Sequence, residues 1–328
     1  MPAQFSACSA ERNRKINNIG FRALFRKELA DHLNGTRFYL IFALLLVTSA
    51  AALFTAANTL KDSGVTSSEF LFLKLFTTSG SYIYSFATWI AFLGPLAGIA
   101  LGFDSITNER SQGTLNRLAA QPIYRDSIIN AKFLAGAFAL LLILVTLGLF
   151  MTGGGLLLIG VVPAFEEILR IVFFLILAWV YLSVWLAVSI SFSVVCRHGA
   201  TAALSGIAVW LFLCMFMSTV AGGIANLLYP LEGIEGYANM RSNYELNLGL
   251  NRISPYYLFS EATTTILNPS VRSIGIVTME SYSGALSGYL SLEQSLLLVW
   301  PHLVVMAALA MAGFAAAYIS FMRQEIRA

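Results

Sequence analysis

The side chains that most often carry out catalysis or bind metals are few in this sequence and lie far apart. They comprise three histidines and three cysteines: His32, His198, His302, Cys8, Cys196 and Cys214. None forms a CxxC pair or a group with metal-ligand spacing. The sequence also lacks a phosphate-binding loop, HExxH, GxSxG and GxGxxG. We therefore expect no catalytic residue, no metal site, no cofactor and no ATP hydrolysis on this chain.

One polar segment, 104–132, carries a dense pattern of charged, small and leucine side chains. Leu115 and Leu118 are three residues apart, so a short helix would present both on one face to an apolar groove of a partner. Pro122 would end that helix. Glu109 could hold it in place by pairing with Arg110, Arg117 or Arg125. The alternative is a positively charged loop that serves membrane topology only.

The distribution of charge predicts the elements that position this segment. Asp, Glu, Lys and Arg are absent from six stretches: 38–60, 75–103, 133–165, 171–196, 199–231 and 294–322. Each exceeds the ~20 apolar residues that an α-helix needs to cross a ~30 Å hydrocarbon layer. A charge at the bilayer centre costs about 2.5–3.5 kcal/mol on insertion scales. We therefore predict an all-α polytopic membrane protein with six transmembrane helices.

The composition supports this fold class. Only 11% of the residues are charged, against roughly 25% in ordinary soluble domains, so no soluble domain of appreciable size is expected. The net charge of +3 gives no basis for binding nucleic acid. The first 37 residues are polar and basic, unlike a signal peptide, so we expect the first span to be retained.

The distribution of Lys and Arg predicts the orientation. With six spans, the side that holds both termini carries 14 of these residues and the other side carries 6. Cytoplasmic loops hold the excess of Lys and Arg. We therefore expect both termini in the cytoplasm, at the plasma (inner) membrane. The loop 104–132 and a short break at Arg197-His198 share that side, and 232–293 is a large external loop.

The N-terminal segment 1–37 is expected to be cytoplasmic and to contain an amphipathic helix at the membrane interface. Within 19–33, five apolar residues fall on one helical face: Phe21, Leu24, Phe25, Leu29 and Leu33. Basic residues on the other face would contact lipid headgroups. A cytosolic helix packed on a partner is the alternative. The rest, 38–328, is expected to form a single six-span domain.

Glycines predict where two spans end. Gly153-Gly154-Gly155 is expected to interrupt the third stretch, which leaves a span of roughly 133–151. A short external hairpin would follow, containing Glu166, Glu167 and Arg170. The fifth span is expected to end near Gly222-Gly223.

The expected external loop, 232–293, contains aromatic residues. Its prolines favour ordered short helices near the membrane surface. Tyr244, Tyr256 and Tyr257 are candidates for a lid or for contact with a periplasmic or extracellular protein, because aromatic side chains bury large areas in recognition surfaces. A connector that merely caps the two spans it joins is the alternative.

The segment 104–132 resembles the first cytoplasmic loop of the membrane subunits of ABC-2 type transporters. That family's pattern is Glu-Arg-x-x-Gly-Thr-Leu, two leucine-rich turns, Pro, Arg, and Lys at the start of the next span. The matching residues are Glu109, Arg110, Gly113, Thr114, Leu115, Leu118, Pro122, Arg125 and Lys132. The entry helix, the six-span plan, Ile253-Ser254-Pro255 and the FMRQEIR ending also match. The chain most resembles single-domain permeases of nitrous-oxide-reductase maturation and gliding-motility systems.

The resemblance implies the permease subunit of an ATP-binding-cassette exporter. Such a subunit forms the translocation path as a dimer, here a homodimer, and couples to a separate ATPase that carries ATP and Mg. The motif residues from Glu109 to Arg125 would make a cytoplasmic coupling helix between spans 2 and 3. Candidate path residues in the second and fifth spans are Tyr82, Tyr84, Thr88, Ser205, Ser218 and Thr219. Interhelical packing by their hydroxyls is the alternative.

Three other functions remain open. An ion-coupled secondary transporter normally needs ionisable groups at the membrane midplane, and the six charge-free stretches offer no Asp, Glu, Lys or Arg there. A membrane-embedded enzyme would need a group of reactive side chains inside the spans. An ABC-type machine that transmits force to an external partner without export also fits. The sequence does not name a cargo; its apolar spans favour a lipid-like, peptide or amphiphilic one over a bare ion.

Overall fold

The computed structural model describes residues 20–62, 70–80, 82–114, 124–232, 235–269 and 290–324. In these ranges the ordered elements are all helices. An entry helix over 20–34 comes first. It is followed by α2 (Thr36–Asp62), α3 (Leu71–Thr77), α4 (Phe86–Gly102), α5 (Thr107–Ser111), α7 (Arg125–Ile159), α8 (Phe165–Val195), α9 (Gly199–Leu211), the π-helix η1 (Phe212–Phe216), α10 (Met217–Leu228), α11 (Glu235–Asn251), α12 (Pro255–Leu267) and α14 (Leu292–Arg323).

Within the part of the chain that the structure describes, six helical segments are long and apolar enough to cross a membrane. They are Thr36–Asp62, Phe86–Ser111, Arg125–Ile159, Phe165–Val195, Gly199–Leu228 and Leu292–Arg323. The prediction of an all-α protein with six membrane spans is therefore confirmed. The physical reason is that a helix is the segment that satisfies its own backbone hydrogen bonds in lipid.

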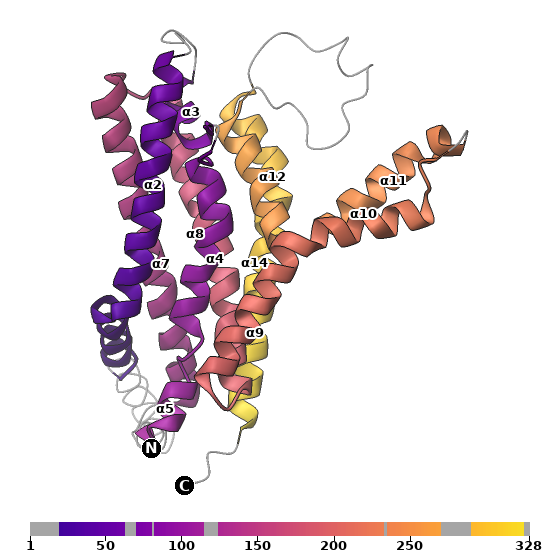
Figure 1. Cartoon of the computed structure of the whole chain (residues 1–328). Helices are drawn as coiled ribbons and strands as arrows, with labels where there is room; N and C mark the ends of the chain where they lie inside the picture. The colour runs from indigo at the N-terminus through magenta and orange to yellow at the C-terminus, as the bar shows by residue number, and fades with distance from the viewer. Residues whose placement is uncertain are drawn as a thin grey trace, which may run out of the picture.

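The spans form a bundle around α8, which packs against α4, α7 and α14. The entry helix and the C-terminal end of α14 lie at one end of the bundle, here called the entry-helix end (Figure 1). The helix α3 and the C-terminal end of α12 lie at the other, called the far end. Trp185 and Tyr181 on α8 are fully buried at the centre.

A stripe of glycines brings α4 and α8 into close contact. Gly94, Gly98 and Gly102 are spaced four residues apart and share one face of α4. A Cβ atom at Gly98 would lie 2.7 Å from the carbonyl oxygen of Leu182 and 2.9 Å from the amide nitrogen of Leu186. Small residues at this spacing let membrane helices pack backbone to backbone.

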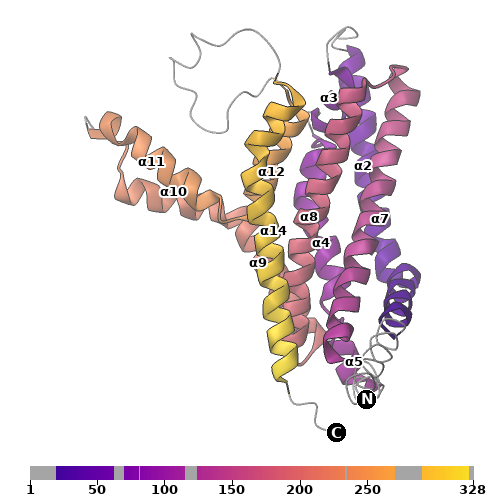
Figure 2. The ribbon, with the colours of Figure 1, turned by 180° about the vertical axis from the view of Figure 1, so that it is seen from behind.

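The fifth span bends at η1 and leaves the bundle. Beyond the bend, α10 and α11 pack against each other and project from the bundle as a hairpin, here called the arm (217–251), as Figures 1 and 2 show. Asn243 Nδ2 closes the hairpin by donating to Asn226 Oδ1 and to the Tyr229 carbonyl oxygen, both at 2.8 Å. A π-helical turn inserts an extra residue, and this accounts for the change of direction.

The chain returns from the arm into the bundle through α12. Ser254 is the residue before this helix, and its Oγ donates to the Leu213 carbonyl oxygen at 2.8 Å. Phe259 then stacks on Tyr181 with ring centroids 4.5 Å apart. As a result α9 lies in the entry-helix half of the bundle and α12 in the far half (Figure 1).

Several predicted boundaries are wrong. The second apolar stretch was expected to begin at residue 75, but the second span begins at Phe86. Residues 71–77 form the separate short helix α3. The glycines 153–155 lie inside α7, which runs unbroken to Ile159. The fifth span continues past Gly222-Gly223 to Leu228.

The predicted hairpin around Glu166 is also wrong, because this residue, Glu167 and Arg170 lie in the first two turns of α8. The predicted break at Arg197-His198 is confirmed, since α8 ends at Val195 and α9 begins at Gly199.

The segment 232–293 differs most from its prediction as an external loop. Its ordered helices are present, but α12 packs against α8, α14 and α4 within the bundle. Eight of its residues are buried, among them Leu258 and Ile266. The prediction failed because charged residues in this segment were taken as evidence against insertion, whereas Arg252 and Glu261 pair with each other within the bundle.

Candidate functional sites

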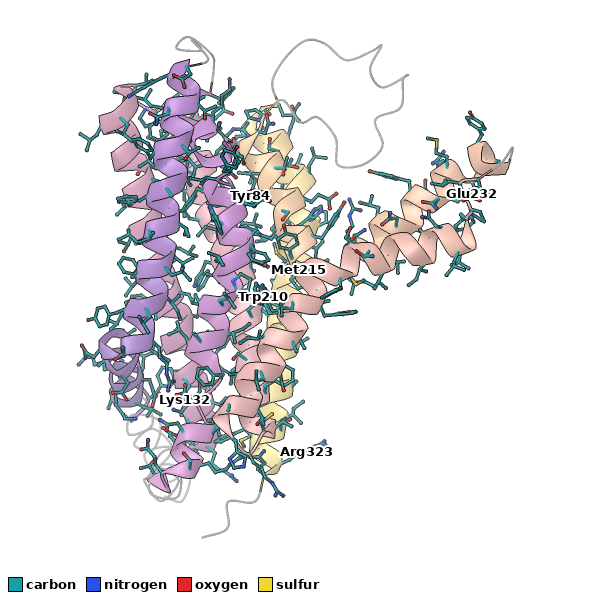
Figure 3. The ribbon with its side chains drawn as sticks, viewed as in Figure 1. Tyr84, Lys132, Trp210, Met215, Glu232 and Arg323 are labelled. Atoms are coloured by element: carbon teal, nitrogen blue, oxygen red, sulfur yellow. The ribbon has the colours of Figure 1, made fainter. Side chains whose placement is uncertain are left out.

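An ion network lies at the entry-helix end, where Lys132 is buried (Figure 3). Its ammonium group lies 2.9 Å from Glu28 Oε2 on the entry helix and 2.8 Å from Glu109 Oε1 on α5. Lys27 extends the network, 3.1 Å from Glu28 Oε1. Three elements distant in sequence, the entry helix, α5 and α7, are thereby joined by charge.

The network favours the ionised form of Glu28. Burial by itself would raise the pKa of Glu28, but the ammonium groups of Lys132 and Lys27 outweigh burial and hold the pKa below its ordinary value of 4.5. Burial lowers the pKa of the neighbouring His32 below its ordinary 6.5, so this imidazole is neutral at pH 7. A buried ammonium between two carboxylates is a rigid link, because removing one partner leaves a buried charge unpaired.

The predicted coupling residues Arg110 and Arg125 contact the C-terminal end of α14. The Arg110 guanidinium donates to Gln324 Oε1 and, at 3.2 Å each, to the carbonyl oxygens of Val194 and Cys196. Arg125 donates to the Gln324 carbonyl oxygen at 3.0 Å. The end of span 2 is therefore fixed to the α8–α9 break, and the end of span 2 and the start of span 3 are both fixed to the last helix.

Of the arginines expected to pair with Glu109, Arg110 and Arg125 bind elsewhere, and Arg117 lies outside the described residues. Glu109 pairs with Lys132, at the first turns of α7, and lies 4.0 Å from Lys27. Gly113 has a positive φ of 68° and follows α5, and Thr114 Oγ1 donates to the Glu109 carbonyl oxygen at 3.2 Å. Leu115, Leu118 and Pro122 lie outside the described residues.

The candidate path residues do not gather at one place. Tyr82 and Tyr84 lie in the segment before α4 and not within the second span, and their side chains are exposed. Thr88 is in the first turn of α4. Ser205 lies on α9, whereas Ser218 and Thr219 lie beyond the bend on α10. The bend therefore separates the fifth-span residues that the sequence placed on one continuous helix.

The three tyrosines assigned to an external surface also separate. Tyr244 is on α11 in the arm, where it is partly exposed. Tyr256 and Tyr257 are half-buried in the first turn of α12. Their position inside the bundle follows from the packing of α12.

The sequence interpretation missed a charged group within the bundle. Glu261 on α12 lies 2.8 Å from His302 Nε2 on α14 and 2.8 Å from Arg252 Nη2. His302 is buried and comes ten residues after Leu292, or ~15 Å along the helix. Glu261 and Arg252 lie outside the six charge-free stretches, which is why the sequence interpretation did not consider them as part of the bundle. The i, i+9 spacing of Arg252 and Glu261 gave no usable signal, because no local helix brings them together.

A second missed group fixes the far end. Arg170 on α8 is fully buried. Its guanidinium donates to the carbonyl oxygens of Ile266 at 3.0 Å and Leu290 at 2.7 Å, and to Ser295 Oγ at 3.1 Å. Glu166 supplies the counter-charge at 2.8 Å. These bonds join the end of α12 and the start of α14 to α8.

A hydroxyl-rich cavity of about 410 Å³ lies at the far end, between the start of α4 and α12. Thr88 and Tyr256, assigned by sequence to two different sites, both line it. Within the residues described, no three His, Cys, Asp or Glu side chains gather closely enough to hold a metal ion.

Fold and sites together define a polytopic membrane protein whose ionic links join the ends of its helices. The family model described as "ABC-2 family transporter protein" matches residues 22–326. The chain therefore belongs to the ABC-2 transporter family, as its permease. Membrane subunits of this family lack ATPase activity, carry no cofactor and pair with an ABC ATPase. A comparison with curated proteins found no match.

Proposed function

We propose that this chain is the membrane subunit of an ABC exporter, coupled at its entry-helix end to a separate ATPase and working as a homodimer. In this orientation the entry-helix end faces the cytoplasm of the plasma (inner) membrane. The excess of Lys and Arg on that side supports it.

The observation that carries the proposal is how the ends of spans 2 and 3, which flank the proposed docking segment, are held. Glu109 is tied through Lys132 to the entry helix, and Arg110 to the α8–α9 break and α14. A partner that moved this segment would move four elements together. Coupling of this kind requires a rigid connection between the docking surface and the helix bundle.

The fifth span and the arm are the proposed dimer surface. Of the 18 most apolar consecutive residues of the fifth span only 11% are buried, whereas the corresponding share is 61% for the second and fourth spans. The arm lies level with α12 beside the far half of the bundle (Figure 1), with Glu232 near its tip (Figure 3). Its helix α11 exposes Arg241 and Glu245, which lipid solvates poorly. A second copy would cover them.

Docking is tested by Leu115→Asp with Leu118→Asp in the full chain co-expressed with its cognate ATPase. Charges in an apolar groove should reduce co-purification of the ATPase and its stimulation, while membrane insertion is unchanged. Ala23→Asp with Ala30→Asp, at exposed positions on the entry helix outside the spans, adds the same two charges at the same end of the protein and controls for their effect on insertion. Normal binding and stimulation by the segment variant would refute ATPase docking there.

Ion coupling is the second candidate function, and the Glu261–His302 pair favours it, because intramembrane carboxylates and imidazoles serve as proton sites in transporters. Arg252 argues for a structural role, since it already neutralises Glu261. Transport by vesicles that persists with a proton gradient but without ATP would support this candidate over the exporter.

A further inference from the structure

A second, larger cavity of about 780 Å³ lies at the entry-helix end. Residues of the entry helix, of the start of α2 and of the adjoining ends of α4 and α5 line it, together with Lys132 (Figure 3). Its volume lies within the roughly 300–1,000 Å³ that ligand pockets occupy. The cavity is open rather than enclosed, so it can hold a small polar group that remains attached to a larger molecule.

The cavity lies where the first span begins. Thr36, the first residue of that span, and Phe38, the first residue of the charge-free stretch, both line it. The next residues of α2, Tyr39 and Leu40, have exposed side chains, and a tyrosine at the end of a span is typical of the membrane interface. The cavity is therefore at the level of the lipid headgroups, beside a helix surface that acyl chains can cover.

Charged side chains of both signs line the cavity. The cations are Lys27, Arg37 and Lys132, and the carboxylates are Glu28, Asp31, Asp104 and Glu109. The carboxylates exceed the cations by one, so a ligand that is only anionic would meet repulsion here. Lys132, Glu28 and Glu109 already satisfy one another in the buried network.

The charges that a ligand can reach belong to two ion pairs. Lys27 lies 3.4 Å from Asp31 on the entry helix, and both side chains are more than half exposed. Arg37, at the start of α2, pairs with Asp104, and more than half of the arginine side chain is exposed. Exposed ion pairs are weak, so each of these groups can share its partner with a charge on a ligand.

His32 adds a neutral group to the lining. Burial holds its pKa below the ordinary 6.5, so at pH 7 the imidazole has one donor and one acceptor nitrogen. Among the described residues no side chain or carbonyl group bonds this ring. Its acceptor nitrogen is therefore available to an N–H group of a ligand.

These groups match a ligand that carries a phosphate and a primary ammonium. Arg37 would donate to the phosphate, at the end of α2 where the first backbone N–H groups have no partner within the helix. The ammonium would donate to Asp31 and to the neutral ring of His32. A quaternary ammonium such as choline has no N–H and could not make these hydrogen bonds.

We propose that this cavity binds a phosphoethanolamine group, with Arg37 at the phosphate and Asp31 at the ammonium. The group is either the headgroup of phosphatidylethanolamine in the adjacent leaflet or a free soluble compound. The site goes beyond the proposed export function, because it holds whatever the cargo is and whether or not an ATPase docks between spans 2 and 3.

The first test uses the purified full-length permease in nanodiscs with equal amounts of phosphatidylethanolamine and phosphatidylcholine that have the same acyl chains. Native mass spectrometry measures the lipid that the protein retains. We expect phosphatidylethanolamine to be preferred roughly 2- to 10-fold, as one additional hydrogen bond would give. In a parallel mixture with phosphatidylglycerol, which carries only the negative charge, phosphatidylethanolamine should again be preferred.

Asp31→Asn tests the ammonium contact. It breaks an exposed pair with Lys27, and it should lower the preference for phosphatidylethanolamine roughly 2- to 5-fold, the range for an exposed ion pair. The matched control is Asp62→Asn, which removes an exposed carboxylate at the other end of α2. This control should retain the full preference.

Arg37→Gln tests the phosphate contact. It should lower retention of both lipids roughly 2- to 5-fold, whereas Arg197→Gln, at an exposed position of the α8–α9 break, should not. If Arg37→Gln lowers thermal stability because Asp104 loses its partner, the double variant Arg37→Gln with Asp104→Asn replaces it. The double variant removes the whole pair and leaves no charge unpaired.

A last arm distinguishes the two sources of the group. Free phosphoethanolamine is added to the permease in phosphatidylcholine nanodiscs, and saturation-transfer NMR measures its binding. Preferential retention of phosphatidylethanolamine that falls in Asp31→Asn identifies a lipid headgroup, whereas binding of the free compound alone, weakened by the same variant, identifies a soluble ligand. Equal retention of the two zwitterionic lipids without binding of the free compound, unchanged binding in Asp31→Asn and Arg37→Gln, or a preference for phosphatidylglycerol would overturn the proposal.

Discussion

His302 Nε2 and Glu261 Oε2 lie 2.8 Å apart and join α14 to α12 inside the bundle. Arg252 holds the same carboxylate from the end of the arm, with Nε at 3.0 Å and Nη2 at 2.8 Å. One carboxylate therefore links the arm, α12 and the last span. In a low-dielectric interior such shared contacts fix geometry, because each partner would be costly to leave unpaired.

Replacing Glu261 should loosen this link. Glu261→Gln keeps the shape but removes the charge, and we expect a loss of about 1.5–3 kcal/mol, the range for hydrogen bonds to charged groups. Thermal unfolding in nanodiscs measures it. Asp31→Asn, which breaks the exposed i, i+4 pair with Lys27 on the entry helix, should leave the melting temperature unchanged. Equal melting temperatures for the two variants would contradict a stabilising role for Glu261.

Lys132→Met should destabilise the entry-helix end. The change leaves Glu28 and Glu109 facing each other without the cation between them, and breaking a buried pair in this way costs about 3–5 kcal/mol. The Lys27 side chain is 56% exposed in the same network, so Lys27→Met should have a clearly smaller effect. Limited proteolysis of the entry helix and thermal unfolding check both. A larger loss for Lys27→Met would assign the network to the wrong lysine.

Acid should weaken the same network. Because the folded pKa of Glu28 is held below its ordinary 4.5, its contribution to stability is complete above that value. The contribution is lost as the pH falls from 4.5 through the folded pKa. Melting temperature should therefore fall on acidification below pH 4.5, and Glu28→Gln should reduce that dependence. A Glu28→Gln variant with an unchanged acid profile would remove Glu28 as its source.

The contact between α4 and α8 should tolerate no side chain at Gly98. Gly98→Ala places a methyl group 2.7 Å from a backbone oxygen, and overpacking of this kind costs about 1–3 kcal/mol. Gly153→Ala makes the same change in α7, where no atom lies within 4 Å. It should be neutral or stabilising. Thermal unfolding compares them, and similar values would mean that α4 shifts to make room.

Cysteine accessibility in intact cells tests the orientation. In a background without Cys8, Cys196 and Cys214, Tyr82→Cys before α4, where the native side chain is 96% exposed, should react with a membrane-impermeant thiol reagent. Asn108→Cys on α5 should react only after the membrane is broken. The reverse pattern would place the entry-helix end outside the cell.

Local composition was enough to predict the spans, because hydrocarbon excludes charge over a whole helix length. The amphipathic pattern of the entry helix was equally local. Leu24 is buried, and Phe25 packs on Phe138 with ring centroids 6.3 Å apart, so its apolar face contacts the bundle. The assignment of α12 failed because it depends on a contact that is distant in sequence. Glu261 on its own argues against packing of this segment in the bundle, and only its pairing with His302 on the last span removes that objection.

Two further features had sequence signals that were not used. The i, i+4 glycines at 94, 98 and 102 are typical of close helix contacts. The glycines 153–155 were taken as a helix end, yet α7 continues, because Gly154 and Gly155 are covered by Leu53 and Leu75. The bend at η1 had no local signal, since residues 212–216 are as apolar as those around them.

The π-helical turn at Phe212–Phe216 makes the direction of the arm a matter of residue count. Each residue of an α-helix turns the chain by about 100°, so the one extra residue sets the face from which α10 departs. Removing a single residue there would leave every other span untouched and aim the arm elsewhere. A length change of one residue could therefore redirect a whole hairpin, an adjustment that point substitution along α10 or α11 cannot make.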